Sequence, residues 1–375
     1  MRSLGTFIAA AALAVLAASH ASAVELVYGT GSGAKSRINI DAIEPFVAET
    51  TKESGGSITW KYLPGNQIVT IRTALKGLRD NLVDAGMVVP VYVRKDLIEI
   101  NSVYDTVFFG DDDIVASAGA AHETLVLHCP ECVAEFGKNN SFLLASYASS
   151  EQVLACTKPV KTVAELKGLK IRAPGPLQRV AKALGGVPVS LPPQELALAL
   201  DRGGLDCAFT PLNWMISFGI QDVAKYVVDY HFGSSRALGL IVMNRDTWRK
   251  KLTREQRRIL WQRAPLASAR SVVVSYIQLD AKYRKTIGPT KGVQFFKAGS
   301  DFTKIMDGIR SGAEKVLVAE ISKQGAKQAA KTVAAFTKTL AKWRKLSQTE
   351  IKNDTDAYAR VLKREIYDKL DPEKL

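Results

Sequence analysis

The fold is decided by residues 161–211, which read KTVAELKGLKIRAPGPLQRVAKALGGVPVSLPPQELALALDRGGLDCAFTP. Thr162 and Glu165 have the Thr-x-x-Glu spacing of a capping box, and the strand that follows ends at Arg172, before Pro174. Glycine and proline pairs then separate a helix, a strand, a second helix and a last strand. Crossover helices of this length predict parallel strands, whose carboxyl ends commonly hold ligands. Arg172 lies at such an end and is therefore a candidate binding residue.

The first 23 residues have the composition of a secretory signal peptide. Arg2 supplies the positive charge, residues 7–18 are apolar, and Ala21-Ser22-Ala23 is a small-residue cleavage site. About twelve apolar residues are too few to span a bilayer, although an uncleaved anchor is an alternative. We therefore expect a signal peptide over 1–23 and a mature protein that is soluble in the periplasm.

The chain is basic, with a formal net charge of +14. Such a charge can indicate binding to nucleic acid or to an anionic surface. However, the lysines concentrate over residues 315–345 and near the C-terminus, among alanines and acidic residues. This pattern favours a solvated helical face, so no nucleic-acid partner is expected. The positive charge could also attract anionic solutes.

Residues 29–36 read GTGSGAKS and follow a predicted strand. They resemble a Walker A loop, but Ala34 replaces the glycine that must precede Lys-Ser for the backbone to approach phosphates. Nucleotide hydrolysis is therefore not expected. The glycines could instead bring main-chain amides close to a small anionic ligand, or they could form a plain turn.

Four cysteines occur, Cys129 and Cys132 in a CPEC motif, Cys156 and Cys207. In an oxidising periplasm they favour disulfides, because no second Cys-x-x-Cys or nearby histidine pair completes a zinc site. Three full pairings are compatible with the sequence. A periplasmic thiol-disulfide protein that uses CPEC is an alternative, since such a motif at a helix start can lower a thiol pKa.

Several separate stretches resemble one family. They are, in chain order, YLPGNQ, LKGLRDNLVDAGMV, ELKGLKIRAPG, GGVPVSLPPQELALAL, the strand led by Asp206, and ALGLIVMNRDTWRKKLTREQRRIL. Their order and spacing are similar to the DctP-type solute-binding proteins of tripartite ATP-independent periplasmic (TRAP) transporters. The resemblance covers nearly the whole chain after residue 23. It implies an α/β, two-lobed periplasmic-binding-protein fold with interwoven lobes and a long bridging helix.

The resemblance and the length of the chain together predict where the lobes lie. About 350 residues after the signal exceed what one core usually serves. We expect the first lobe to contain 24–150 plus 237–300, and the second lobe to contain 151–236 plus 301–375 with its C-terminal helices. Apolar spacing predicts the bridging helix from Arg254 to about Thr286, kinked at Pro265, and a further helix over 122–138.

The resemblance assigns Arg172 to the carboxylate of a solute, and a guanidinium is suited to that role because it donates two parallel hydrogen bonds. Gln152 stands where the family often has a second arginine. Thr210 stands where the family has an asparagine, and Pro193 where it has an aromatic residue. These three departures argue against a C4-dicarboxylate or sialic acid as the ligand.

Further ligand-binding residues are expected from both lobes. Trp214 could cover an apolar part of the solute, and Arg236 could neutralise a second carboxylate. The first lobe is expected to contribute Thr30, Ser32, Gln67, the neighbouring asparagine and the strand end over 87–89.

The function implied by the resemblance is capture of a small organic acid anion between the lobes and delivery to small and large membrane subunits. We expect a monomer, no cofactor, no metal and no catalytic residue, because neither Gly-x-Ser-x-Gly nor His-Glu-x-x-His occurs. A binding protein that serves a sensor or another uptake system is a second alternative.

Overall fold

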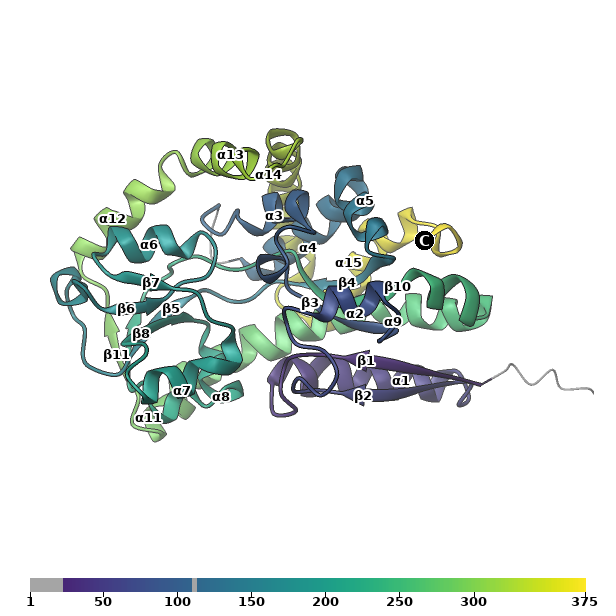
Figure 1. The fold of residues 1–375 in the computed structure, drawn as a ribbon, viewed down its shortest axis with the longest axis horizontal. Helices are drawn as coiled ribbons and strands as arrows, with labels where there is room; N and C mark the ends of the chain where they lie inside the picture. The colour runs from purple at the N-terminus through teal and green to yellow at the C-terminus, as the bar shows by residue number, and fades with distance from the viewer. Residues whose placement is uncertain (1–22, 110–112) are drawn as a thin grey trace, which may run out of the picture.

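The computed structural model describes residues 23–109 and 113–375, which form two lobes, each built on one β-sheet (Figure 1). The expected signal peptide, apart from its last residue, lies outside the described residues. The predicted two-lobed α/β architecture is confirmed.

The first-lobe sheet has the strand order β2-β1-β3-β10-β4. Its strands are β1 (Val24–Gly29), β2 (Ile58–Leu63), β3 (Ala85–Val88), β4 (Ser141–Tyr147) and β10 (Leu238–Asn244). β1 pairs in parallel with β2 and β3, whereas β10 is antiparallel to both of its neighbours. All residues of β3, β4 and β10 are buried, because helices cover both faces of this sheet.

The second-lobe sheet has the order β11-β9-β5-β8-β6-β7. Its strands are β5 (Val153–Cys156), β6 (Lys170–Arg172), β7 (Val187–Val189), β8 (Cys207–Thr210), β9 (Tyr226–Asp229) and β11 (Gln294–Lys297). β6 is parallel to both β7 and β8, as the β-α-β-α-β pattern predicts. The capping box of Thr162 and Glu165 is present and starts a short 3₁₀ helix ahead of β6.

The lobes are interwoven because the chain crosses between the sheets more than once. It passes to the second lobe between β4 and β5 and returns between β9 and β10. The helices between these strands are α1 (Glu44–Glu53), α2 (Ala74–Arg79), α3 (Ile98–Tyr104), α4 (Ile114–Glu123), α5 (Pro130–Lys138), α6 (Leu177–Ala183), α7 (Leu196–Asp201) and α8 (Leu212–Ser217).

The expected helix over 122–138 is interrupted. α4 ends in a π-helical turn at Thr124–His128, and α5 begins anew at Pro130. Cys129 has φ −129° and ψ 78°, outside the helical region, because the proline ring disfavours a helical residue before it. The same ring is well suited to the first position of α5.

The bridging helix connects the cores of both lobes. It runs through α9 (Arg254–Val272), a π-helical stretch, α10 (Leu279–Lys282), a second π-helical turn and α11 (Gly288–Thr290). Ile259 packs in the first-lobe core, and Tyr283 packs in the second-lobe core. The α-helix continues through Pro265 without interruption. Figure 1 shows this helical path passing along both lobes.

Two segments lie in lobes other than those expected. β11 joins the second-lobe sheet, although it falls within 237–300. α12 (Ser300–Arg310) follows it and packs in a second-lobe core, whereas α13 (Ala313–Lys323) lies against α3 and α14 (Ala329–Leu346). α14 and α15 (Thr355–Glu365) pack in the first-lobe core. Trp343 explains the second difference, because its ring lies directly over Gly119 of α4. α14 is rich in lysine, but it also has an apolar stripe, and such a stripe must pack against another element such as α4.

Candidate functional site

A cavity lies between the two lobes at the carboxyl end of β6. The cavity is narrow, about 40 Å³, and the space among its lining side chains is about 570 Å³ when its open mouth is counted. Its lining residues are Ser32, Ser36, Ile38, Ile71, Met87, Val89, Tyr92, Tyr104, Tyr147, Ser149, Gln152, Arg172, Pro174, Pro193, Trp214, Phe218, Ser235, Leu238 and Tyr276. Arg172 is the one charged side chain among these described residues.

Arg172 is held rigidly although it is only 2% exposed. Its Nε donates to the Leu191 carbonyl at 3.1 Å, and one terminal nitrogen donates to the Phe209 carbonyl at 2.9 Å. The other terminal nitrogen donates to the Tyr92 hydroxyl at 3.0 Å, across the two lobes. The guanidinium also lies 5.3 Å from the ring centre of Trp214. These contacts fix the direction of the guanidinium without cancelling its charge.

No carboxylate pairs with Arg172 among residues 23–109 and 113–375. Burying an unpaired charge is costly, and carbonyl dipoles compensate for it only in part. An anionic group in the cavity would complete the pairing, and a carboxylate matches the geometry of a guanidinium.

Tyrosine side chains make up much of the remaining polar surface of the cavity. Burial raises the pKa of Tyr104 to about 12, and it raises the pKa of Tyr147 and Tyr276 still further above the ordinary value. These hydroxyls therefore stay protonated at neutral pH and can donate hydrogen bonds. The Tyr147 hydroxyl donates to the sulfur of Met87 at 3.8 Å, a weak acceptor that a ligand oxygen could replace.

The two lobes touch directly beside the cavity. Gln194 Nε2 donates to the Gly31 carbonyl at 3.0 Å, and Tyr92 donates to the Leu191 carbonyl at 3.3 Å. A Cβ atom at Gly31 would lie 2.7 Å from the backbone nitrogen of Ile71, so this position in the glycine loop has no room for a side chain. Gly31 therefore allows a close approach of two backbone segments, a role that differs from both the ligand contact and the plain turn expected from the sequence.

Four of the sequence-predicted residues line the cavity together, namely Arg172, Gln152, Trp214 and Ser32. Two others are buried outside it. The Thr210 hydroxyl donates to the Pro211 carbonyl at 3.1 Å. Arg236 turns toward the Phe109 carbonyl and Ser234, at 3.2 and 2.7 Å, and contacts the ring of Phe336.

The remaining predicted residues also lie away from the cavity. Thr30 is fully buried and its hydroxyl accepts from the backbone of Ser32 at 3.1 Å. Gln67 is exposed to solvent and does not line the cavity. The cavity wall of the first lobe instead comes from Ile71, Met87 and Val89, of which the strand end over 87–89 is expected from the sequence.

Four tyrosines that line the cavity were not predicted from the sequence, namely Tyr92, Tyr104, Tyr147 and Tyr276. Tyr276 lies in the apolar stripe of the bridging helix, and such a stripe is usually core. Tyr92 follows β3 in a 3₁₀ turn (Pro90–Tyr92) that the pattern does not reveal. Tyr92 could have been found as a polar aromatic residue just beyond the end of a buried parallel strand.

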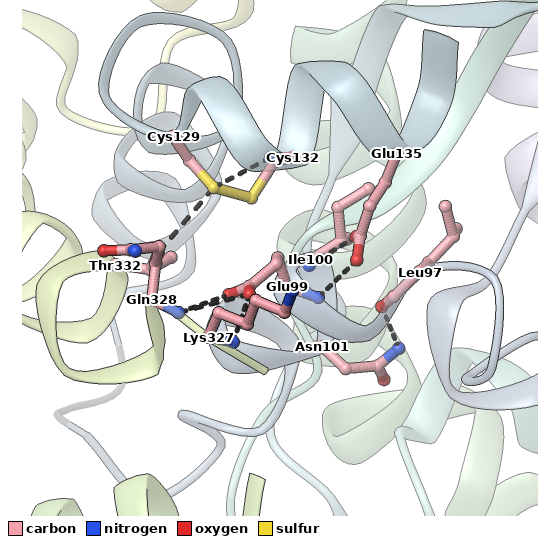
Figure 2. Close-up of a disulfide and its surroundings, with 10 residues drawn as sticks. All are labelled: Leu97, Glu99, Ile100, Asn101, Cys129, Cys132, Glu135, Lys327, Gln328 and Thr332. Atoms are coloured by element: carbon pink, nitrogen blue, oxygen red, sulfur yellow. Dashed lines mark hydrogen bonds between the residues drawn. A yellow bond between two sulfur atoms is a disulfide. The ribbon is translucent and has the colours of Figure 1, made fainter. Parts of the chain in front are cut away.

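The four cysteines form two disulfides, Cys129–Cys132 and Cys156–Cys207. The second joins residues that face each other across the antiparallel strands β5 and β8. The first closes the start of α5 (Figure 2), where Cys129 Sγ also accepts from the Cys132 backbone at 3.1 Å. Cys129 and Cys132 are 1% and 0% exposed, so neither sulfur is available to another protein in this conformation.

Two buried glutamates lie next to this disulfide (Figure 2). The Glu135 carboxylate accepts from the backbone nitrogens of Glu99 and Ile100, at 2.7 and 3.1 Å, at the start of α3. The Glu99 carboxylate in turn accepts from the backbone nitrogens of Lys327 and Gln328, just before α14. Burial and the neighbouring negative charge of Glu99 raise the pKa of Glu135 to about 7. We call this cluster, Glu99, Glu135 and residues 327–328, the helix junction.

Among residues 23–109 and 113–375, no group of three or more histidine, cysteine or acidic side chains is arranged to hold a metal ion. No helix there combines the length and the apolar character needed to cross a membrane.

Comparisons with known proteins agree with this architecture. A family model described as bacterial extracellular solute-binding protein, family 7, matches residues 29–307. A TRAP solute binding protein from Rhodoferax ferrireducens, solved with copurified benzoate, has a TM-score of 0.76 at 19% identity, covering 86% of this chain and 99% of its own. A marine-metagenome TRAP solute binding protein specific for aromatic acid ligands, solved with 3-hydroxybenzoate, has a TM-score of 0.75 at 20% identity with the same coverage.

A curated relative matches part of the sequence. It is a solute-binding protein from Albidiferax ferrireducens, 24% identical over 220 residues, which are 58% of this chain and 63% of the relative. The chain thus spans somewhat less than two thirds of that relative's length.

Proposed function

The chain belongs to the bacterial extracellular solute-binding proteins of family 7, the TRAP receptors of DctP type, and from this premise we propose that it binds a monocarboxylate with an aromatic or apolar body. Members of this family bind substrates for transport. The observation that supports this proposal most strongly concerns Arg172. It is a buried cation that lines the cavity and has no acidic partner in the described part of the chain.

A single carboxylate is supported by the charge of the cavity wall. Arg172 is its one charged side chain among the described residues, and Gln152 lies where a second arginine is common in the family. A second carboxylate would be desolvated without a cation to pair with it, which costs several kcal/mol.

An aromatic or apolar body is supported by the rest of the wall. Trp214 and Phe218 of the second lobe line the cavity together with Ile71, Val89 and Leu238 of the first lobe. Flat rings and aliphatic side chains favour a flat apolar ligand, because its burial removes apolar surface from water. The benzoate and 3-hydroxybenzoate bound by two structural relatives have this shape and one carboxylate.

The transport role follows from the two lobes. A ligand that contacts both lobes stabilises the closed state, because it shifts the equilibrium by its differential affinity for that state. The closed receptor, exported to the periplasm as a monomer, would then dock on the small and large membrane subunits and release the acid. A role in thiol exchange is less well supported, since both sulfurs of the CPEC motif are buried in a disulfide.

The test is a binding screen of mature protein that has been unfolded, stripped of ligand and refolded. Thermal stability is measured with aromatic and aliphatic monocarboxylates, dicarboxylates, sugar acids and uncharged amides of the same acids. We expect aromatic monocarboxylates to raise the melting temperature most, because ligand binding stabilises the native state by mass action. A response to dicarboxylates alone, or equal responses to acids and amides, would contradict the proposal.

Delivery to a transporter needs a separate measurement. Uptake of the acid found in the screen is followed in cells that contain or lack this chain together with TRAP membrane subunits. Uptake that does not depend on the chain would favour a sensor or another transport system.

A further inference from the structure

We infer that Gln152 selects acids that carry a hydrogen-bond donor, a hydroxyl or N–H group, on the body of the ligand. The inference rests on the proposed function, since it concerns the same cavity. It adds a chemical requirement that neither the single carboxylate nor the apolar wall imposes.

Gln152 is a buried polar residue with one unpaired atom. The residue is 2% exposed and lines the cavity just ahead of β5, whereas Arg172 lies on β6. Its backbone is fixed by hydrogen bonds to the carbonyl of Gly233 and from the backbone of Phe232, at 2.7 and 3.0 Å. Its side-chain Oε1 is buried and has no hydrogen-bond partner among residues 23–109 and 113–375.

The neighbouring Ser149 determines which way the amide faces. The Ser149 hydroxyl has a single proton, which it donates to the Ser150 carbonyl at 3.0 Å. The same oxygen accepts from the backbone of Ser235 at 3.1 Å and from Gln152 Nε2 at 3.3 Å. If the amide were reversed, Oε1 would face an oxygen that has no proton left to donate. The hydrogen bonds therefore direct the amide nitrogen to Ser149 and leave the amide oxygen as an acceptor.

The acceptor at Gln152 differs from the other polar groups of the cavity. The guanidinium of Arg172 only donates. The protonated hydroxyls of Tyr104 and Tyr276 can both donate and accept, whereas the Gln152 oxygen can only accept. These groups suit the oxygens of a carboxylate. The Gln152 oxygen suits the opposite partner, a proton carried by another part of the ligand.

The unpaired oxygen of Gln152 has an energetic cost that a ligand can remove. A buried acceptor without a partner costs about 1–3 kcal/mol, and a ligand that supplies a donor removes this cost. A ligand without a donor leaves the Gln152 oxygen unpaired and also excludes water from it. Sites built around a hydrogen bond discriminate against analogues that lack it for this reason.

The experiment compares acids that differ at one group. Dissociation constants are measured by calorimetry on the refolded, ligand-free protein for benzoate, the three hydroxybenzoates and the matching methoxybenzoates. Phenylacetate, mandelate and O-methylmandelate form a second series. We expect at least one hydroxy acid to bind about tenfold more tightly than both its parent and its methyl ether. The ether is the critical control, because it adds similar bulk and an oxygen without the proton.

Gln152→Met then tests the residue itself, because methionine keeps the length of the side chain and removes the acceptor. The preference should fall below about threefold, through weaker binding of the hydroxy acid rather than tighter binding of its parent. Gln221→Met is the matched control. Gln221 is another buried glutamine of the second lobe, and its Oε1 has no partner in the part of the chain that the structure describes. It does not line the cavity, so the preference should persist.

The outcomes separate this inference from the proposed function. Acids that bind through Arg172 without any preference for a hydroxyl would overturn the inference alone. A preference that survives in Gln152→Met would also overturn it. If no acid binds, both fail. The wild-type comparison needs no variant, so an absent preference for the hydroxy acids refutes the inference even if Gln152→Met does not fold.

Discussion

The interlobe cavity and the helix junction both bury ionisable side chains, but the groups around these side chains differ. At the junction, the carboxylates of Glu99 and Glu135 accept hydrogen bonds from backbone nitrogens at the starts of α3 and α14. In the cavity, Arg172 donates to two carbonyls and one tyrosine hydroxyl, and it meets no carboxylate in the described chain.

The difference distinguishes a structural charge from a functional one. A carboxylate at the start of a helix meets free backbone N–H groups and a favourable dipole, so it needs nothing from outside the fold. A guanidinium held by neutral acceptors keeps its full charge for a ligand. The junction should therefore respond to substitution through stability, and the cavity through binding.

The largest expected effect is on binding. Arg172→Met should weaken the binding of an aromatic acid by about 1,000-fold, or about 4 kcal/mol, because the ligand carboxylate would be buried without its partner. Circular dichroism should show the same fold. Arg179→Met is the control, since this arginine of the same lobe contacts the ring of Phe108 and lies outside the cavity. If Arg172→Met bound the acid within threefold of the wild-type affinity, Arg172 would not be the partner of the carboxylate, and the distinction between the cavity and the helix junction would fail.

A smaller effect is expected at the junction when its disulfide is removed. The Cys129–Cys132 bridge closes a loop with a sequence separation of 3, so chain entropy predicts a loss of about 2 kcal/mol in the double alanine variant. Chemical denaturation measures this loss, and calorimetry should give an unchanged affinity for the acid. A large drop in affinity at unchanged stability would mean that the junction acts on the cavity.

The smallest effect concerns pH. The pKa of Glu135 is raised from 4.5 to about 7, so the folded state holds its proton more tightly than the unfolded state does. The stability that this proton contributes is complete below pH 4.5 and is lost as the pH rises through about 7.

Glu135→Gln should therefore gain stability relative to wild type over that interval. The change in pKa sets an upper limit of about 3 kcal/mol, and solvent screening brings the expected gain to the order of 1 kcal/mol. Denaturation curves at pH 4.5, 6 and 8 give the difference, with Glu131→Gln on the same helix as the control. Parallel pH profiles for wild type and Glu135→Gln would contradict the assignment.

Much of the second lobe follows from its sequence, because its signals are local. The capping box at Thr162, the glycine and proline pairs and the short apolar runs each mark a boundary, and parallel pairing then fixes the order of β8, β6 and β7. The positions of α14 and α15 are not local. They depend on Trp343 meeting Gly119, more than 200 residues away in the chain, and no spacing within α14 contains that information.

The site divides in the same way. Arg172 is predictable because it ends a strand at the edge where parallel sheets bind ligands. The orientation of Gln152 depends on Ser149 and on the backbone of Ser235, which come together only at the crossing between lobes. Arg236 illustrates the converse, since an arginine near the same crossing turns away toward Phe109 and Ser234.

The interwoven path of the chain also determines how the molecule would carry a load. β1 and the final turn at Pro372–Lys374 both belong to the first lobe, where the Trp248 indole donates to the Pro372 carbonyl at 2.8 Å. A force applied between these two ends would pass through the first lobe alone. The second lobe is an insertion between its strands and helices, so it would bear no tension until the first lobe yields. In an optical trap, ligand-dependent closure and mechanical rupture would thus be separate events.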